Sequence, residues 1–87
     1  MSKNRWVVYL VRCRDRSLYC GISSDLRGRL KEHNAGTGAK YTRSRRPVEL
    51  VGKSPEMTKE DALRLEHRIK RLPADRKIAA LAGGTGF

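Results

Sequence analysis

The sequence predicts a small α/β fold in which a three-stranded sheet, antiparallel or mixed, is flanked by helices in the order β-β-α-β-α-α. Short β-branched and aromatic runs separated by a turn open the chain, which indicates a hairpin. Two longer segments with apolar residues at helical spacing follow, on either side of a third short apolar run. The chain has 87 residues, so we expect one domain over residues 1–87, with its core at about 5–82 and a loose tail at 83–87.

Three segments have the composition of strands. Residues 6–13 read Trp-Val-Val-Tyr-Leu-Val-Arg-Cys, which is typical of a buried strand, and residues 14–17 give a turn. Residues 18–22 form the second strand, and the short turn makes this hairpin antiparallel. Residues 48–53 form the third strand, whose partner the sequence leaves open.

The first helix is expected directly after the hairpin. Ser24 can cap its first turn, and the helix runs to about Asn34. Gly36 supplies a stop because glycine readily adopts a left-handed conformation. Leu26 and Leu30 form the apolar stripe that binds this helix to the sheet.

Two further helices follow the third strand. Thr58 begins a sequence like a capping box, which opens a helix to about Leu72. Pro73 ends that helix and suits the first turn of a last short helix over residues 74–82.

The composition predicts a nucleic-acid partner. Lys and Arg total 20 against 9 Asp and Glu, which gives a formal charge of +11, and such an excess favours polyanions because binding releases their counterions. No run approaches the ~20 apolar residues of a spanning helix, and the N-terminus lacks a signal-peptide pattern. We therefore expect a cytoplasmic protein that binds nucleic acid and not a membrane.

Tyr9 and Tyr19 lie on the two strands of the predicted hairpin. They share one sheet face only if directly opposed residues sum to an even number, as they do with a three-residue turn such as residues 15–17. That register also places Cys13 and Cys20 on opposite faces, so the two thiols cannot bond. For either tyrosine alone, the sequence favours packing at the edge of the core over chemistry.

Three residues on the predicted helices could act on a phosphate. Arg29 and His33 are four apart and stand on one helix face, as a phosphate clamp beside a proton acceptor or as a solvated basic face. Glu66 lies on the flank of the apolar stripe of the second long helix, among cationic neighbours. It could neutralise them, or hold one hard divalent cation together with water and phosphate oxygens.

A glycine-containing basic loop is expected over residues 36–47. It carries four cations and one aromatic residue within seven positions: Lys40, Tyr41, Arg43, Arg45 and Arg46. Cations with an interleaved aromatic ring are typical of nucleic-acid contacts, and a solvated flexible loop is the alternative.

Taken together, these residues resemble the GIY-YIG nuclease superfamily. Residues 7–9, Val-Val-Tyr, stand where the Gly-Ile-Tyr motif falls, and residues 19–21, Tyr-Cys-Gly, where Tyr-Ile-Gly falls. Residues 25–30 resemble the helix that bears the catalytic arginine. Residues 39–42 resemble a pattern shared by small stand-alone bacterial proteins made of this domain alone. The ordered set, and no single motif, carries the resemblance.

The resemblance implies a metal-dependent endonuclease that hydrolyses phosphodiester bonds and nicks DNA, which we expect as the substrate in preference to RNA. Tyr9, Tyr19, Arg29 and His33 would be catalytic, and Glu66 would hold one Mg²⁺ or Mn²⁺ ion. One such site makes one cut, so a monomer should nick, and a cut through both strands would need a transient dimer.

Two other interpretations stay open. A non-catalytic nucleic-acid-binding module on a nuclease fold would keep the groove without turnover. The lack of asparagine in residues 67–87 favours it, because several nucleases of the superfamily carry one after the glutamate. A regulatory or ribosome-associated basic protein would need only charge. The presence of all five predicted site residues together favours the enzyme.

Overall fold

A computed structural model of the chain describes residues 5–83, with side chains as far as residue 81. The elements are β1 (Val7–Arg12), β2 (Leu18–Ser23), α1 (Leu26–Ala35), α2 (Lys40–Arg43), β3 (Glu49–Lys53), α3 (Lys59–Lys70) and α4 (Ala74–Gly83). The α/β class and the element order are confirmed, with the short helix α2 as an addition. The part of the predicted tail beyond Gly83 lies outside the described residues.

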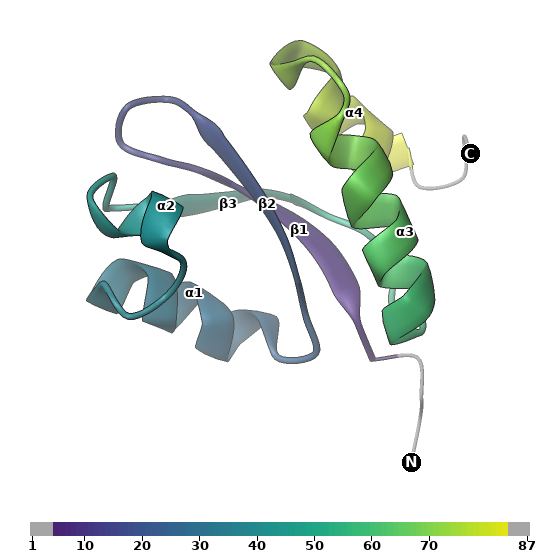
Figure 1. Ribbon diagram of the computed structural model, residues 1–87, viewed down its shortest axis with the longest axis horizontal. Helices are drawn as coiled ribbons and strands as arrows, with labels where there is room; N and C mark the ends of the chain where they lie inside the picture. Colours follow the sequence, from purple (N-terminus) through teal and green to yellow (C-terminus); the bar gives the residue numbers. More distant parts are fainter. Residues whose placement is uncertain (1–4, 84–87) are drawn as a thin grey trace.

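The sheet is antiparallel throughout, in the strand order β2-β1-β3. The strand β1 is central because its apolar run is buried on both faces, from Val7 to Val11. The helices form two layers, with α1 and α2 on one side of the sheet and α3 and α4 on the other (Figure 1). The sheet edge formed by β2 thus lies between the two layers.

The hairpin register confirms the parity argument. Tyr9 is opposite Gly21, and the other pairs of this ladder likewise sum to an even number. Tyr9 and Tyr19 therefore share the sheet face that α1 covers. Cys13 and Cys20 lie on opposite faces as free thiols, as expected.

The turn of this hairpin falls one residue earlier than residues 15–17, the turn considered from the sequence. Cys13 N donates to the carbonyl oxygen of Ser17 at 2.8 Å, so the three turn residues are 14–16. Arg16 has a φ of 72°, the left-handed conformation that closes a three-residue hairpin turn. The Asp15 carboxylate accepts from Ser17 N at 3.0 Å and holds the turn.

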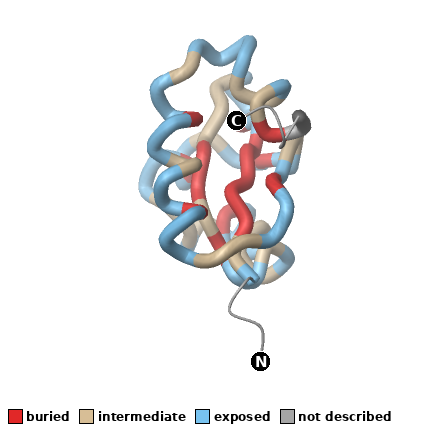
Figure 2. The backbone as a smooth tube through the Cα atoms, turned by 90° about the vertical axis from the view of Figure 1, so that its right-hand side faces the viewer, coloured by how far each residue is buried: buried red, intermediate tan, exposed pale blue. Residues whose placement is uncertain are grey.

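Two apolar clusters pack on the two faces of the sheet, and Figure 2 shows the buried residues concentrated in the strands between the helices. The α3 side contains buried Val8, Leu10, Cys20, Ala62, Ile69 and Leu81. The α1 side contains buried Tyr9, Val11, Cys13 and Val48, with Tyr19, Leu26 and Leu30 packed against them. The predicted stripe of the first helix is therefore confirmed.

The helix ends differ from prediction at one position. The N-cap of α1 is Asp25 and not Ser24: its carboxylate accepts from Gly28 N at 3.2 Å, while Asp25 N donates to Ser23 Oγ at 2.9 Å. The carboxylate is the better acceptor for the free N–H groups of the first turn. At the other end Gly36 has a φ of 86° and is the left-handed cap predicted.

The predicted cap of the second long helix is confirmed, and the predicted basic loop contains a short helix. Thr58 caps α3, and its Oγ1 accepts from Asp61 N at 3.1 Å. The basic loop is not wholly irregular, because α2 interrupts it with one helical turn. Within the described part of the chain, no helix is long and apolar enough to cross a bilayer.

Candidate active site

The odd-numbered residues of the hairpin and the inner side of α1 form one polar cluster. Tyr9 comes from the central strand, and its ring lies across Gly21 on β2. A Cβ added to Gly21 would lie 2.6 Å from the Tyr9 Oη. Glycine in the second motif therefore makes room for the phenol of the first. The Tyr9 residue has no exposed surface.

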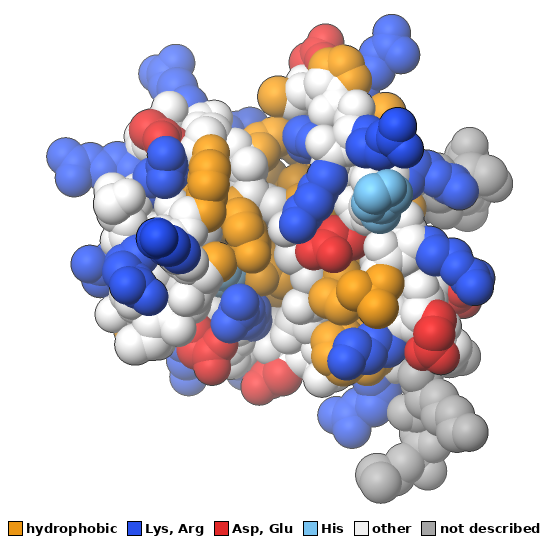
Figure 3. All heavy atoms as spheres, in the orientation of Figure 1, with side chains coloured by type: hydrophobic (Ala, Val, Ile, Leu, Met, Phe, Trp, Pro, Cys, Tyr) orange, Lys and Arg blue, Asp and Glu red, His pale blue; other side chains and the backbone are white. Residues whose placement is uncertain are grey.

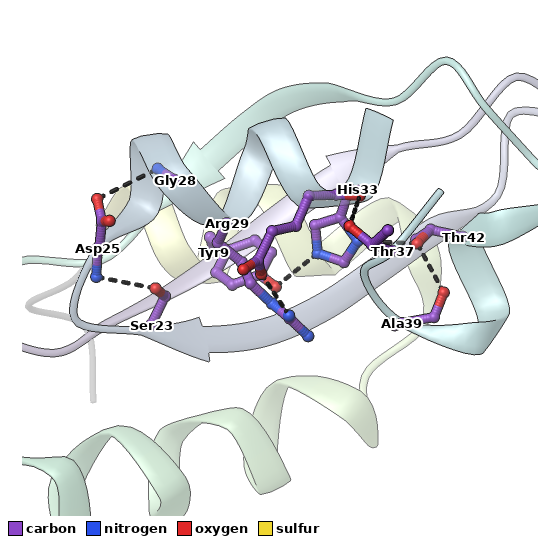
Figure 4. Close-up of polar contacts among 10 residues, drawn as sticks. Tyr9, Ser23, Asp25, Gly28, Arg29, His33, Thr37, Ala39 and Thr42 are labelled. Carbon is purple, nitrogen blue, oxygen red and sulfur yellow. Dashed lines mark hydrogen bonds and ion pairs between the residues drawn. The ribbon is translucent and has the colours of Figure 1, made fainter. Parts of the chain in front are cut away.

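His33 is the hydrogen-bond partner of the Tyr9 hydroxyl. Its Nε2 lies 2.8 Å from Tyr9 Oη, its Nδ1 lies 2.8 Å from Thr42 Oγ1, and the ring lies between these residues (Figure 4). Burial, reinforced by the nearby Arg29 charge, holds the pKa of this buried imidazole below its ordinary value of 6.5. His33 is therefore a neutral base at pH 7, with one ring nitrogen on Tyr9.

Arg29 stands one helical turn before His33 and beside the Tyr9 hydroxyl. Its Nη1 donates to Glu32 Oε1 at 2.9 Å, in an ion pair at the surface. Burial raises the pKa of the Tyr9 phenol above 10.0, and Arg29 offsets part of that rise. The guanidinium thus lies where it can stabilise negative charge on Tyr9 or on a bound phosphate.

Tyr19 completes the cluster from the edge strand β2. The Tyr19 ring centroid lies 5.4 Å from that of His33, with the planes at 65°, and 5.8 Å from that of Tyr41, with the planes at 27°. The guanidinium carbon of Arg45 lies 4.0 Å from the centroid of the Tyr41 ring. The segment after α1 is therefore attached to the cluster through Tyr41.

The structure thus brings Tyr9, Tyr19, Arg29 and His33 together on the α1 side of the sheet, whereas Glu66 comes from α3 on the other side (Figure 1). The Glu66 carboxylate lies 3.5 Å from Lys70 Nζ, and its side chain is 19% exposed. Burial and then the Glu66 charge raise the pKa of the Cys20 thiol to about 12, so Glu66 is near enough to Cys20 for its charge to act on that thiol. Since Cys20 follows Tyr19 and points to the opposite face, Glu66 and the cluster flank the same stretch of the edge strand.

The sequence model of the GIY-YIG catalytic domain matches residues 5–79. The chain belongs to the GIY-YIG family. This confirms the resemblance drawn from the ordered motifs, and it indicates a nuclease domain.

The GIY-YIG relatives of the chain are small bacterial proteins. A UPF0213 protein of Nitratidesulfovibrio vulgaris is 49% identical over 84 residues, which covers 94% of this chain and 76% of the relative. The UPF0213 protein YazA of Bacillus subtilis is 44% identical over 77 residues, covering 88% and 78%. The names of these relatives state no activity.

Two solution NMR structures resemble this GIY-YIG fold. One is a UPF0213 protein of Bacillus halodurans, with 38% identity and a TM-score of 0.54 over 93% of this chain and 86% of that one. The other is a protein of E. faecalis, with 36% identity and a TM-score of 0.62 over 95% and 90%. The small stand-alone branch of the family is therefore the one to which the chain is similar.

Of the predicted nucleic-acid contacts, two arginines also have partners within this GIY-YIG domain. Arg45 Nε donates to Asp15 Oδ2 at 2.9 Å, and Arg45 Nη1 donates to the carbonyl oxygen of Tyr41 at 2.8 Å. Arg46 Nε donates to the carbonyl oxygen of Arg43 at 2.9 Å. These bonds hold the segment after α1 in place.

The other two predicted cations are open to solvent. The side chains of Lys40 and Arg43 are exposed, and within residues 5–81 neither has a hydrogen bond or an ion pair. On the face shown in Figure 3, Lys and Arg side chains spread over both helical layers, with few Asp or Glu between them. A polyanion approaching this face meets mostly positive charge.

Sequence reasoning missed three residues of the GIY-YIG site. Thr42 lies in the segment 39–42, where the sequence shows a family pattern but no role, and its buried hydroxyl contacts His33. Glu32 pairs with Arg29, and its position three residues later on the same helix could have indicated this. Gly38 packs against His33, where an added Cβ would lie 2.7 Å from Nδ1. No spacing rule reaches Thr42 or Gly38, because both lie in an aperiodic segment.

Proposed function

We propose that this GIY-YIG domain is a divalent-metal-dependent endonuclease that hydrolyses a phosphodiester bond of DNA. The hydrogen bond of 2.8 Å between Tyr9 Oη and His33 Nε2, with Arg29 beside it, carries the proposal. In this arrangement a buried phenol can give its proton to a neutral base while it takes one from water. With one such site, a monomer nicks DNA, and a cut through both strands takes two copies.

The proton steps balance without a further base. Tyr9 Oη takes a proton from the attacking water as its own proton passes to His33 Nε2. The resulting hydroxide bonds to phosphorus, the bond from phosphorus to the leaving oxygen breaks, and that oxygen takes a proton from solvent. The raised pKa of Tyr9 supports this relay, because a phenol with such a pKa is not ionised at rest and needs His33 as an acceptor.

Arg29 has two tasks in this proposal. It stabilises the negative charge that develops on the phosphate, as a preorganised cation does best in a site shielded from water. It also controls access, because the Tyr9 hydroxyl is covered at rest while the Arg29 side chain is 33% exposed. Binding of a phosphate would draw the guanidinium away from Glu32, its surface partner, and so open the way to Tyr9. Tyr19, whose ring meets that of His33 edge to face, would orient the water or phosphate through its hydroxyl.

Glu66 is the residue that would hold Mg²⁺ or Mn²⁺. Within residues 5–83, no group of three or more His, Cys, Asp or Glu side chains could cage a metal ion. A single partly exposed carboxylate still fits a hard cation that takes its other ligands from water and substrate phosphate. When bound, the ion would polarise the phosphate and stabilise the leaving oxygen.

The nucleic-acid surface would combine cationic side chains that have no partner in the described residues with others that are bonded within the domain. Lys40 and Arg43 would contact phosphates directly, since neither side chain has a hydrogen bond or an ion pair within residues 5–81. Tyr41, Arg45 and Arg46 would contribute to the same surface while also holding the segment after α1. These contacts are to phosphates and would not select a sequence.

The test is cleavage of supercoiled, single-stranded and branched DNA, and of RNA, with Mg²⁺ or Mn²⁺ and with a chelator. We expect wild type to nick DNA only with metal, and Glu66→Ala to bind DNA but lose turnover. Glu60→Ala is the matched control, because it removes an exposed carboxylate from the same helix. Cleavage by Glu66→Ala at the wild-type rate would exclude the proposed metal ligand.

A nucleic-acid-binding module without turnover is the second candidate. Two observations favour it: Glu66 is paired with Lys70, and residues 67–87 contain no asparagine. In that case wild type would bind all the DNA substrates with a steep salt dependence and cut none of them under any metal condition.

A further inference from the structure

Thr42 is a fully buried threonine whose hydroxyl makes two hydrogen bonds. Its Oγ1 lies 3.0 Å from the carbonyl oxygen of Ala39 and 2.8 Å from His33 Nδ1. A carbonyl oxygen can only accept, so the single hydroxyl proton of Thr42 is donated to Ala39. The Thr42 oxygen then accepts from the imidazole, and Nδ1 of His33 carries a proton.

The proton on Nδ1 decides what the other nitrogen can do. A neutral imidazole has one N–H and one lone pair, so Nε2 faces Tyr9 Oη as an acceptor. The opposite tautomer would give Thr42 two acceptors for one proton, so the hydroxyl would lose its hydrogen bond either to Nδ1 or to the Ala39 carbonyl.

The backbone around Thr42 is built to hold this contact. Thr42 N also donates to the Ala39 carbonyl, at 3.2 Å, so the single turn of α2 directs the hydroxyl. Gly38 lets the segment approach the imidazole, since an added Cβ would lie 2.7 Å from His33 Nδ1 and 2.9 Å from its Cα. His33 is thus enclosed by the segment 38–42 on the side opposite Tyr9.

We propose that Thr42 is a positioning residue that holds His33 as the Nδ1–H tautomer and so keeps Nε2 free to take the Tyr9 proton. The effect of Thr42 on the cleavage rate rests on the proposed endonuclease function, whereas the tautomer of His33 is a property of the resting protein. Thr42 touches no substrate and acts only through His33.

The direct test is NMR of the imidazole nitrogens, which distinguishes the two tautomers. The chain has only two histidines, and the exposed His67 serves as the internal reference. We expect the Nδ1–H tautomer for His33 in wild type and in Thr42→Ser, and a shift to the Nε2–H tautomer in Thr42→Val, which keeps the shape but loses the hydroxyl. Thr37→Val, at an exposed position just before this segment, should leave His33 unchanged.

The cleavage rate supplies the second measurement. Thr42→Val should lower the cleavage rate by at least ~10-fold. The loss should not exceed the ~10²–10⁴-fold that general acid–base catalysis contributes. Thr42→Ser should restore the rate to within a few-fold of wild type. The groups facing His33 stay unchanged, namely Tyr9 and Tyr19 from the strands and Arg29 and Glu32 from its own helix. The acid limb of the pH–rate profile of Thr42→Val should therefore move to lower pH only because the imidazolium loses its acceptor.

The outcomes separate the two proposals. An Nε2–H tautomer in wild type overturns the role of Thr42 even if Thr42→Val does not fold, and so does a folded Thr42→Val that keeps Nδ1–H or the full rate. If no variant cuts any substrate while the tautomer changes as expected, the endonuclease is wrong and the assignment of Thr42 stands.

Discussion

The two faces of the sheet are built from alternate residues of the same strands and differ in chemistry. The α3 face is apolar, with Leu10 from β1 packed against Ile69 and Leu81 from the helices. The α1 face has its own apolar cluster, but it also buries polar groups, above all Tyr9 and His33, in a network of hydrogen bonds. A hairpin of two short strands therefore serves as core on one side and as candidate site on the other.

The difference indicates where stability and activity can be separated. Apolar burial on the α3 face contributes folding free energy in proportion to area. The polar network on the α1 face contributes little net stability, because its hydrogen bonds replace bonds to water. Substitutions of buried apolar residues on the α3 face should therefore destabilise the fold, and substitutions in the polar network should stop the reaction and leave the fold intact.

The largest expected effect is on the apolar face. Leu10→Ala should lower the free energy of unfolding by about 2–5 kcal/mol, because it leaves a cavity where the side chain is fully buried. Leu50→Ala is the control, since Leu50 is 39% exposed on the neighbouring strand β3. Urea denaturation of both variants measures the difference, and equal losses would contradict the division between core and surface.

The next effect is on the rate of cleavage. Arg29→Ala should lose about 10²–10³-fold, the cost of one preorganised group that stabilises the transition state, with a small change in the unfolding midpoint. Arg27→Ala removes an exposed cation from the same helix and should cut at nearly the wild-type rate. Single-turnover cleavage of supercoiled DNA compares the two, and a loss shared by both would reduce Arg29 to a general phosphate contact.

A smaller effect links His33 to pH. The pKa of His33 is lowered in the folded protein, first by burial, so the unfolded chain binds the proton first as the pH falls. Stability and cleavage should both be intact at neutral pH, and both should decrease as the pH falls below about 6.5 towards the lowered pKa. Thermal melts across this range check the stability, with His33→Gln as the control that lacks this pH dependence. A wild-type protein that gains stability on acidification would contradict the buried neutral imidazole.

The smallest effects concern binding. Lys40→Ala and Arg43→Ala should each weaken DNA binding for all sequences alike and reduce the slope of log affinity against log salt by about 1, as one lost phosphate contact does. Arg45→Ala should in addition disturb the stack of Tyr41 on Tyr19. Fluorescence anisotropy at several salt concentrations measures the slopes, and an unchanged slope would remove either cation from the nucleic-acid surface.

Much of the fold and of the candidate site could be predicted from the sequence. Strand alternation with an odd turn places Tyr9 and Tyr19 on one face, and helical spacing adds Arg29 and His33. The partner of β3 could not be predicted, because a short strand with little pattern does not specify its neighbour. Helix α2 has only four residues, too few for a periodic signal, so the contact of Thr42 with His33 could not be predicted. The angle of Glu66 on its helix was predictable, whereas its distance from the cluster depends on how α3 packs.

The central claim is that the bond from Tyr9 to His33 serves chemistry and not only packing, and Tyr9→Phe tests it most directly. This variant keeps the ring and deletes the hydroxyl, so it loses a hydrogen bond worth about 1 kcal/mol and should stay folded. The measurement is its single-turnover cleavage rate, with melting temperature and DNA affinity confirming the fold. We expect cleavage to fall by ~10²–10⁴-fold with DNA affinity unchanged. Cleavage by Tyr9→Phe at the wild-type rate would contradict the account.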